Sequence, residues 1–245
     1  MKPSAQTLRS TAASGEYRPP DIRRTSIWLG IASFAAVIAA QVFAVITSPA
    51  ERDMGHLQKI MYVHVPAAWM TFLAFFVVLV FSVRYMWRRN ENDDLLAAAA
   101  AEVGAVFNGL TLLLGMIWGR PAWGVWWVWD ARLTSTLVLF LIFVGYLALR
   151  ALVDDTDQRA RWSAAVGAIG AINVPIVYMS VTWWRTLHQP PSSPSTLDPA
   201  YTLGLRLNAI ALLVLMIYFI AKRYEIARVD RAAEHMAQAS AMRGA

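Results

Sequence analysis

The sequence of 245 residues contains no cysteine. A disulfide framework, a thiolate metal site and the covalent attachment of a haem through Cys-x-x-Cys-His are therefore excluded. The sequence also has no P-loop pattern and no recognisable pairing of a nucleophile with a base, so we expect a protein that is not itself an enzyme. Any ATP hydrolysis connected with its activity would belong to a partner.

Charged residues are also scarce. Only 16% of the residues are charged, 58% are hydrophobic, and the mean hydropathy is +0.44. A soluble domain carries nearer 25% charged residues. The apolar residues fall in blocks long enough for a helix to cross about 30 Å of hydrocarbon. Six such blocks are predicted, at 26–47, 63–83, 95–117, 133–153, 162–184 and 203–221. They indicate an all-α integral membrane protein with six transmembrane helices, because the blocks lack the alternation of a β-barrel strand.

The basic residues are distributed unequally between the two sides of the predicted bundle. Of the 22 lysines and arginines, 16 lie in the two tails and the connections at 84–94 and 150–161, and six lie on the opposite side. The positive-inside rule therefore predicts cytoplasmic N- and C-termini. The net charge of +6 is largely this bias, so we do not expect nucleic acid as a partner. Contact with membrane lipid is expected.

Three segments are predicted along the chain. Residues 1–25 are polar and form a cytoplasmic tail, residues 26–225 form the six-helix membrane domain, and residues 226–245 form a C-terminal tail. The first span follows Arg23 and Arg24 as a signal peptide would. Its apolar core is longer than about 7–15 residues and no Ala-x-Ala cleavage site follows, which favours a retained helix.

Four polar residues interrupt the predicted spans: Glu102, Asn108, Asn173 and Asn208. Glu102 should face a partner or water, either in a structural role or on a proton or substrate path. Asn173 and Pro175 predict a kink in the fifth span.

The most unusual stretch is WGRPAWGVWWVWDARLT at 118–134, on the predicted outer side. It holds five of the 11 tryptophans within 12 residues. An interfacial aromatic belt and a platform for a flat ligand are both open, although a belt would spread over more helix ends. Asp130 also suits the N-cap of a helix that begins at Ala131, with Arg132 as its ion-pair partner.

Two histidines are predicted on the same outer side, although 124 residues separate them. His64 lies at the end of the second span, two residues before Pro66, and His188 follows the fifth span. His56 lies in a charged connection and His235 in the C-terminal tail, so neither is a candidate. A porphyrin needs axial nitrogens for its iron, flat apolar surfaces, and cations for its two carboxylates. This side supplies all three, the cations being Arg120, Arg132 and Arg185.

The tryptophan stretch resembles the signature of the WWD-domain haem-handling proteins, close to WGxxWxWDxRLT. The six spans, the length, and one outer histidine on each side of the signature are similar to the CcmC branch of that family, the haem exporter C proteins of bacterial cytochrome c maturation. Larger WWD relatives have more spans and more histidines. The resemblance covers approximately residues 26–225 and no position departs from the motif.

The resemblance implies that His64 and His188 are the axial ligands of a non-covalent haem b on the periplasmic face. It also implies a WWD platform that holds the haem edge, formed by Trp118, Gly119, Trp123, Gly124, Trp126, Trp129, Asp130, Arg132, Leu133 and Thr134. The implied partners are the ABC-type subunits CcmA and CcmB, the small CcmD protein and the haem chaperone CcmE, which would receive the haem.

Two other functions remain open. A b-type electron-transfer cytochrome would place haem ligands within the bilayer, often towards both sides, whereas both candidate histidines lie at one surface. A small-solute permease would use Glu102 and the asparagines of the spans as its polar path.

Overall fold

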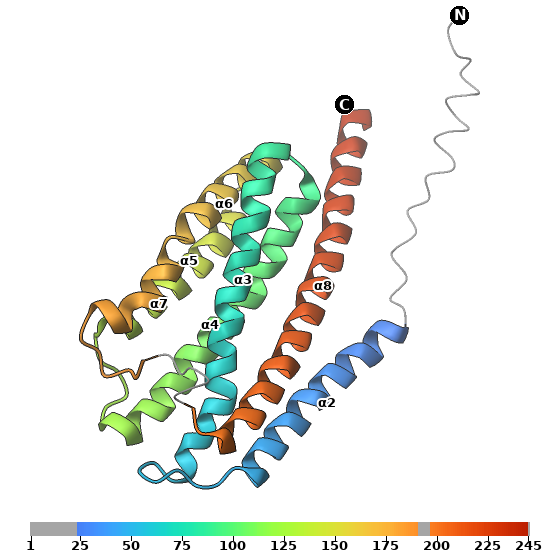
Figure 1. The fold of residues 1–245 in the computed structure, drawn as a ribbon. Coiled ribbons are helices and arrows are strands. Elements are labelled where there is room, and N and C mark those ends of the chain that lie inside the picture. The colour runs from blue at the N-terminus through green and yellow to red at the C-terminus, as the bar shows by residue number, and fades with distance from the viewer. Residues whose placement is uncertain (1–23, 191–196, 245) are drawn as a thin grey trace, which may run out of the picture.

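The computed structural model describes residues 24–190 and 197–244, and every regular element within these ranges is a helix. The predicted N-terminal tail lies almost wholly outside the described residues. The elements are α2 (Arg24–Thr47), the 3-10 helix η1 (His56–Ile60), α3 (Met61–Arg88), α4 (Glu91–Trp123), α5 (Ala131–Leu152), α6 (Thr156–Gly170), α7 (Asn173–Trp183) and α8 (Pro199–Gly244). Figure 1 shows α3 and α4 in the middle, with α5, α6 and α7 on one side and α8 and α2 on the other.

Six helical segments are long and apolar enough to cross a membrane. They are Ile27–Thr47, His56–Arg88, Glu91–Trp123, Ala131–Leu152, Thr156–Trp183 and Pro199–Ala237. The predicted all-α membrane protein with six spans is confirmed. Most segments run further than predicted, because helices continue beyond the hydrocarbon wherever the flanking residues still favour them.

The contact between α3, α4 and α5 forms the centre of the bundle. Phe75 of α3 and Phe143 of α5 meet edge to face, with ring centroids 4.7 Å apart. Gly104 of α4 allows this approach, because a Cβ there would lie 2.5 Å from Cζ of Phe143. The fold thus brings α5 against α4 and sets the spacing of the helices toward both ends.

The fifth span is broken where the kink was predicted. Helix α6 ends at Gly170 and α7 begins at Asn173. Pro175 has no N–H to offer the carbonyl of Ala171, which accepts from the N–H of Val174 instead at 3.2 Å. Asn173 donates from Nδ2 to the carbonyl of Ser135 in α5 at 2.9 Å, so the bend is attached to its neighbour.

The connections around 48–60, 124–130 and 184–190 meet at one end of the bundle, here called the outer end, and those at 89–90 and 153–155 lie at the other, the inner end (Figure 1). Helix α4 continues to Trp123, so only residues 124–130 of the tryptophan stretch form a connection without helix. Helix α8 passes through the predicted boundary at residue 225 without a break.

The inner end is held by ion pairs between four helices. Asp94 of α4 accepts from Arg150 of α5 at 2.5 and 2.9 Å, and lies 3.6 Å from Nη2 of Arg231 in α8. Glu234 of α8 pairs with Arg231 and with Arg159 of α6, both at 3.0 Å. These contacts attach the long C-terminal helix to the bundle.

Glu102 of α4 has a partner as well. It forms an ion pair with Arg223 of α8. This agrees with the expectation that the carboxylate would face a partner or water.

Candidate functional site

A cavity opens at the outer end between α3, α4, α5, α7 and segment 184–190; we call it the outer cavity. Its empty volume is about 1080 Å³, the open solvent at its mouth included. Cofactor sites usually have mainly apolar walls with a few polar groups, and the walls of this cavity are of that kind. The predicted site residues on its wall are His64, Trp118, Gly119, Trp123, Arg132, Leu133 and His188. The fold therefore brings together two histidines that are far apart in sequence.

His64 lies one turn inside α3 rather than at its end. The helix begins at Met61 and includes Pro66. The residue is 8% exposed, and its Nδ1 is buried with no hydrogen-bond partner among the described residues. Its ring meets that of Trp118 edge to face at 5.7 Å. A buried imidazole nitrogen without a partner beside a cavity is suited to bind a ligand there.

The space beside His64 depends on a glycine that the sequence analysis did not select. A Cβ on Gly115 would lie 3.2 Å from Cε1 of His64. Gly115 and Gly119 are four residues apart on α4, so they share one helix face. That spacing in the sequence LLLGMIWG was the available signal, because small residues four apart mark a face that allows close approach.

His188 is placed by hydrogen bonds from its own segment. Its backbone N–H donates to Oγ1 of Thr186 at 3.0 Å, and that hydroxyl donates to Oδ2 of Asp130. The N–H of Leu187 donates to the same carboxylate oxygen at 3.1 Å. Asp130 therefore holds segment 184–190 against the start of α5, and Thr186 is a further residue that the sequence analysis did not select.

The ring of His188 is oriented by its neighbour. Nδ1 lies 2.8 Å from the carbonyl oxygen of Gln189, and a carbonyl only accepts, so Nδ1 carries the proton and Nε2 the lone pair. Burial lowers the pKa of His188 below its ordinary value, and this outweighs the opposing hydrogen bond to Gln189. The imidazole is therefore neutral at pH 7, which is the form that binds a metal.

Asp130 also caps α5, as predicted. Its Oδ1 accepts from the N–H of Leu133 at 2.8 Å. Arg132 does not use Asp130 as its hydrogen-bond partner; its Nη1 donates to the carbonyls of Val177 at 2.5 Å and Tyr178 at 3.3 Å. Asp130 thus serves α5 and segment 184–190 together.

Replacing Asp130 with alanine should loosen both elements. We expect a loss of about 1–2 kcal/mol from the helix cap and faster hydrogen exchange at the amides of Leu133 and Leu187. Asp155→Ala is the matched control, because Asp155 caps α6 through Gln158 at 2.7 Å. Hydrogen exchange measured by mass spectrometry checks the prediction. Unchanged protection of Leu187 in the Asp130 variant would contradict the role given to the carboxylate.

The five clustered tryptophans separate into two groups. Trp118, Trp123 and Trp127 line the outer cavity, and the ring of Trp123 lies 6.4 Å from that of His188. Trp126 and Trp129 are 57% and 75% exposed and do not line it. Trp129 supports the wall from outside, since its ring meets that of Trp127 edge to face at 5.4 Å.

The two glycines of the stretch shape the end of α4. Gly119 is buried within the helix, and a Cβ there would lie 3.0 Å from Cε3 of Trp123. Gly124 ends the helix in the left-handed region, with φ of 80°. Arg120 donates to the carbonyl of Gly124 at 2.6 Å, which holds the turn in place.

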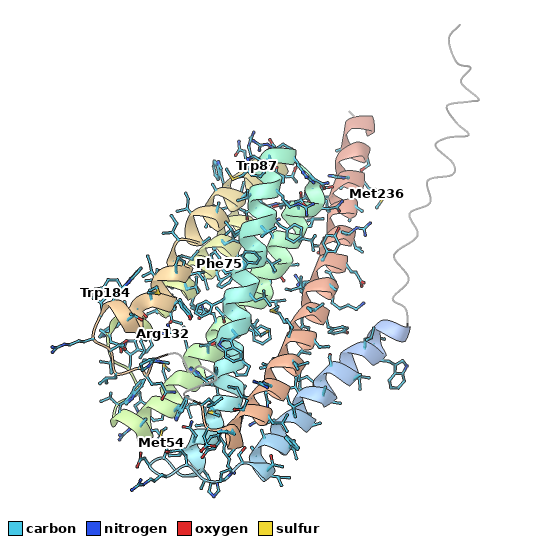
Figure 2. All side chains as sticks on the ribbon, viewed as in Figure 1. Met54, Phe75, Trp87, Arg132, Trp184 and Met236 are labelled. Carbon is cyan, nitrogen blue, oxygen red and sulfur yellow. The ribbon has the colours of Figure 1, made fainter. Side chains whose placement is uncertain are left out.

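Of the three outer arginines considered for a carboxylate ligand, Arg132 lines the outer cavity. Arg185 lines a second, shallower groove with Trp129 and Trp184. Figure 2 shows Arg132 deeper in the bundle than Met54, on the way from the outer end toward Phe75. Its cation therefore lies inside the cavity wall rather than in the outer solvent.

A family model and several known proteins are similar to the chain over most of its length. The family model described as Heme exporter protein C matches residues 12–239. The chain is similar to the Heme exporter protein C of Bradyrhizobium diazoefficiens, with 41% identity over 88% of this chain and 84% of the relative. The protein of that name from Escherichia coli strain K12 is 40% identical over 77% of each chain. The one from Paracoccus denitrificans is 36% identical over 82% of this chain and 86% of the relative.

Proposed function

Because the chain belongs to the Heme exporter protein C (CcmC) family and is a multi-pass membrane protein with a role in handling haem for cytochrome c maturation, we propose that it presents haem b to the chaperone CcmE. In this proposal the haem is cargo, held without a covalent bond by His64 and His188 at the periplasmic face of a bacterial inner membrane.

The observation that carries the proposal is the meeting of His64 and His188 on the wall of one cavity. Two imidazoles are too few for a bare ion, and the described residues include no group of three or more metal-ligating side chains. A porphyrin supplies four nitrogens of its own and leaves two axial positions for the protein. The donor set therefore fits iron that arrives in a porphyrin.

The tryptophans and Arg132 supply the remaining contacts. Trp118, Trp123 and Trp127 give the flat apolar surface that a porphyrin requires, and Arg132 gives a cation for a carboxylate. We propose that Gly119, Gly124 and Asp130 shape this platform, and that Trp126 and Trp129 form its exposed rim. These residues bind and orient the haem, and none of them has to react with it.

The open side of the cavity offers a route for the release of haem. His188 lies on a segment attached through Asp130, whereas His64 belongs to a long helix. We propose that a histidine of the acceptor displaces His188 first, because a short segment moves more readily than a packed helix. Haem would then leave through the mouth of the cavity.

The orientation and the partners complete the proposal. We propose that the inner end lies in the cytoplasm and that the cavity faces the periplasm, and the excess of Lys and Arg at the inner end supports this orientation. CcmA, CcmB and CcmD are the proposed companion subunits. ATP hydrolysis would be carried out by the ABC-type subunits CcmA and CcmB.

The proposal is tested by titrating the purified protein with haem and recording the absorption spectrum. We expect a Soret band with low-spin features of two imidazoles, followed by transfer of the haem to purified CcmE. A protein that stays colourless would overturn the proposal. Rapid reduction by a quinol would favour a b-type cytochrome, and solute uptake by proteoliposomes of this chain alone would favour a permease.

The tryptophan wall gives a second prediction. Trp123→Ala should weaken haem binding by about three- to tenfold, because a stacked or edge-on aromatic contact is worth roughly 0.5–1.5 kcal/mol beyond its buried area. Trp87→Ala is the matched control, since Trp87 is 81% exposed and lies at the opposite end of the bundle in Figure 2. The two titrations should differ. Equal haem affinities of the Trp123→Ala and Trp87→Ala variants would contradict the role of Trp123 in the platform.

A further inference from the structure

The outer cavity is lined, further inward, by a polar side chain that has no hydrogen-bond partner among the described residues. Asn108 of α4 lines this cavity and is 0% exposed. Neither its Oδ1 nor its Nδ2 has a hydrogen-bond partner among the described residues. It lies seven residues inward of Gly115, which adjoins His64, so about 10 Å of helix separates the two levels.

An unpaired amide at this position is costly, so a polar partner is expected inside the cavity. Burial removes the amide from bulk water, and a buried polar group without a hydrogen bond destabilises the fold. The matched case is Asn208 of α8, which is 1% exposed. Its Nδ2 donates to the carbonyls of Ala40 at 3.1 Å and Gly204 at 2.9 Å. Asn108 has no such acceptor among the described residues, although it lines the outer cavity.

The residues around Asn108 indicate which partner fits. The hydroxyls of Thr71, Thr111 and Thr136 line the same part of the cavity, and each donates its proton to a carbonyl of its own helix at 3.0, 2.8 and 2.7 Å. They have lone pairs left but no proton to give. Among these inner residues, hydrogen-bond donation into the cavity therefore falls to the amide of Asn108.

A cation lines the same cavity. The guanidinium of Arg132 reaches inward as far as the carbonyl of Val177, which is fully buried. An amide donor and a guanidinium lining one cavity favour an anionic oxygen, because a desolvated carboxylate is stable only where donors or cations meet it.

We propose that Asn108 donates from Nδ2 to a carboxylate of the bound porphyrin, so that the haem enters with a propionate edge inward. This inference rests on the proposed function and deepens it, since it assigns an orientation and a specificity residue to the same cavity. The opposite edge of the porphyrin then faces the mouth, where an acceptor approaches. Asn108 positions the cargo and takes no part in binding the iron.

The test compares haem with haem dimethyl ester, in which both carboxylates are blocked, on the purified full chain. Asn108→Leu should weaken haem binding about tenfold or more, because a hydrogen bond to a charged group is lost. Its affinity for the ester should stay within about twofold of the wild type, since no carboxylate is present to contact. Asn108→Asp should also weaken haem binding, through repulsion between carboxylates, and spare the ester.

Thermal unfolding without ligand separates this effect from misfolding. Asn108→Leu should be at least as stable as the wild type, because an unpaired amide is removed. The control Asn208→Leu should be less stable and should keep the wild-type ratio of haem to ester affinity.

Three results would overturn the inference. Unchanged haem affinity in Asn108→Leu and Asn108→Asp would make Asn108 a structural residue. Equal weakening of haem and ester would indicate cavity shape instead of carboxylate recognition. A wild type that binds neither ligand would overturn the proposed function together with this inference, whereas a normal bis-imidazole spectrum with unaffected variants would overturn this inference alone.

Discussion

The double variant His64→Ala/His188→Ala is expected to lose the low-spin haem spectrum and to bind haem more than about 100-fold more weakly than the wild type. Groups that only orient metal ligands are worth roughly 10–100-fold in affinity, so removal of both ligands should cost more. Each single variant should retain one axial bond and give a high-spin spectrum. Absorption titration of the purified proteins measures both effects.

The positions of the two histidines in the fold distinguish their single variants. His64 of α3 is buried against Gly115 of α4. Replacement of His64 by alanine therefore leaves a space into which free imidazole can diffuse. We expect added imidazole to restore the low-spin spectrum of His64→Ala. His56→Ala is the control, because His56 belongs to η1 and does not line the outer cavity. A low-spin spectrum that persists in the double variant would exclude these two residues as the ligands.

Asp94→Ala is expected to destabilise the fold by about 3–5 kcal/mol, because it leaves buried cations without their counter-ion. Asp94 contacts Arg150 through both oxygens and also faces Arg231, whose side chain is 8% exposed. For a chain of this size the midpoint of thermal unfolding should decrease by about 10 °C. The measurement is thermal unfolding in detergent followed by circular dichroism.

The control for Asp94 is an ion pair of ordinary exposure. Lys222 and Glu225 lie 2.6 Å apart on α8, and the Glu225 side chain is 55% exposed. Glu225→Ala should change stability by less than about 1 kcal/mol, as exposed pairs do. Equal shifts in the two variants would show that burial of Asp94 does not strengthen the network. Asp94→Asn, which keeps the shape and removes the charge, should fall between them.

The two ends of the bundle thus differ in a way that suits the proposed function. At the inner end, charged contacts connect α4, α5, α6 and α8 and hold the helices at fixed spacing. At the outer end, α3, α4, α5 and α7 leave a cavity, and His188 lines it from the short segment 184–190. A rigid inner end combined with an open outer cavity allows a bound haem to be oriented without being enclosed.

Several features of the site were predictable from sequence because they depend on local chemistry. Asp130 was predicted as the cap of a helix starting at Ala131, and the break near Pro175 was predicted from the missing N–H. The six spans followed from the hydrocarbon thickness. Asn108 was visible as a polar residue in a span, but its lack of a partner was not, since partners come from other helices.

The sequence by itself determined the class of the protein, the number of its spans and the family signature, because hydrophobic length and a run of rare residues are properties of neighbours along the chain. Only the tertiary structure decided which residues share the cavity. Helix α4 continues to Trp123, and its rotation turns Trp118 and Trp123 inward while Trp126 and Trp129 stay exposed. The packing of α5 on α7 carries Arg132 to the carbonyl of Val177, and the packing around α4 leaves Asn108 lining the outer cavity without a hydrogen-bond partner among the described residues. The physical reason is that helix rotation and depth are set by packing between segments, and no local pattern encodes them.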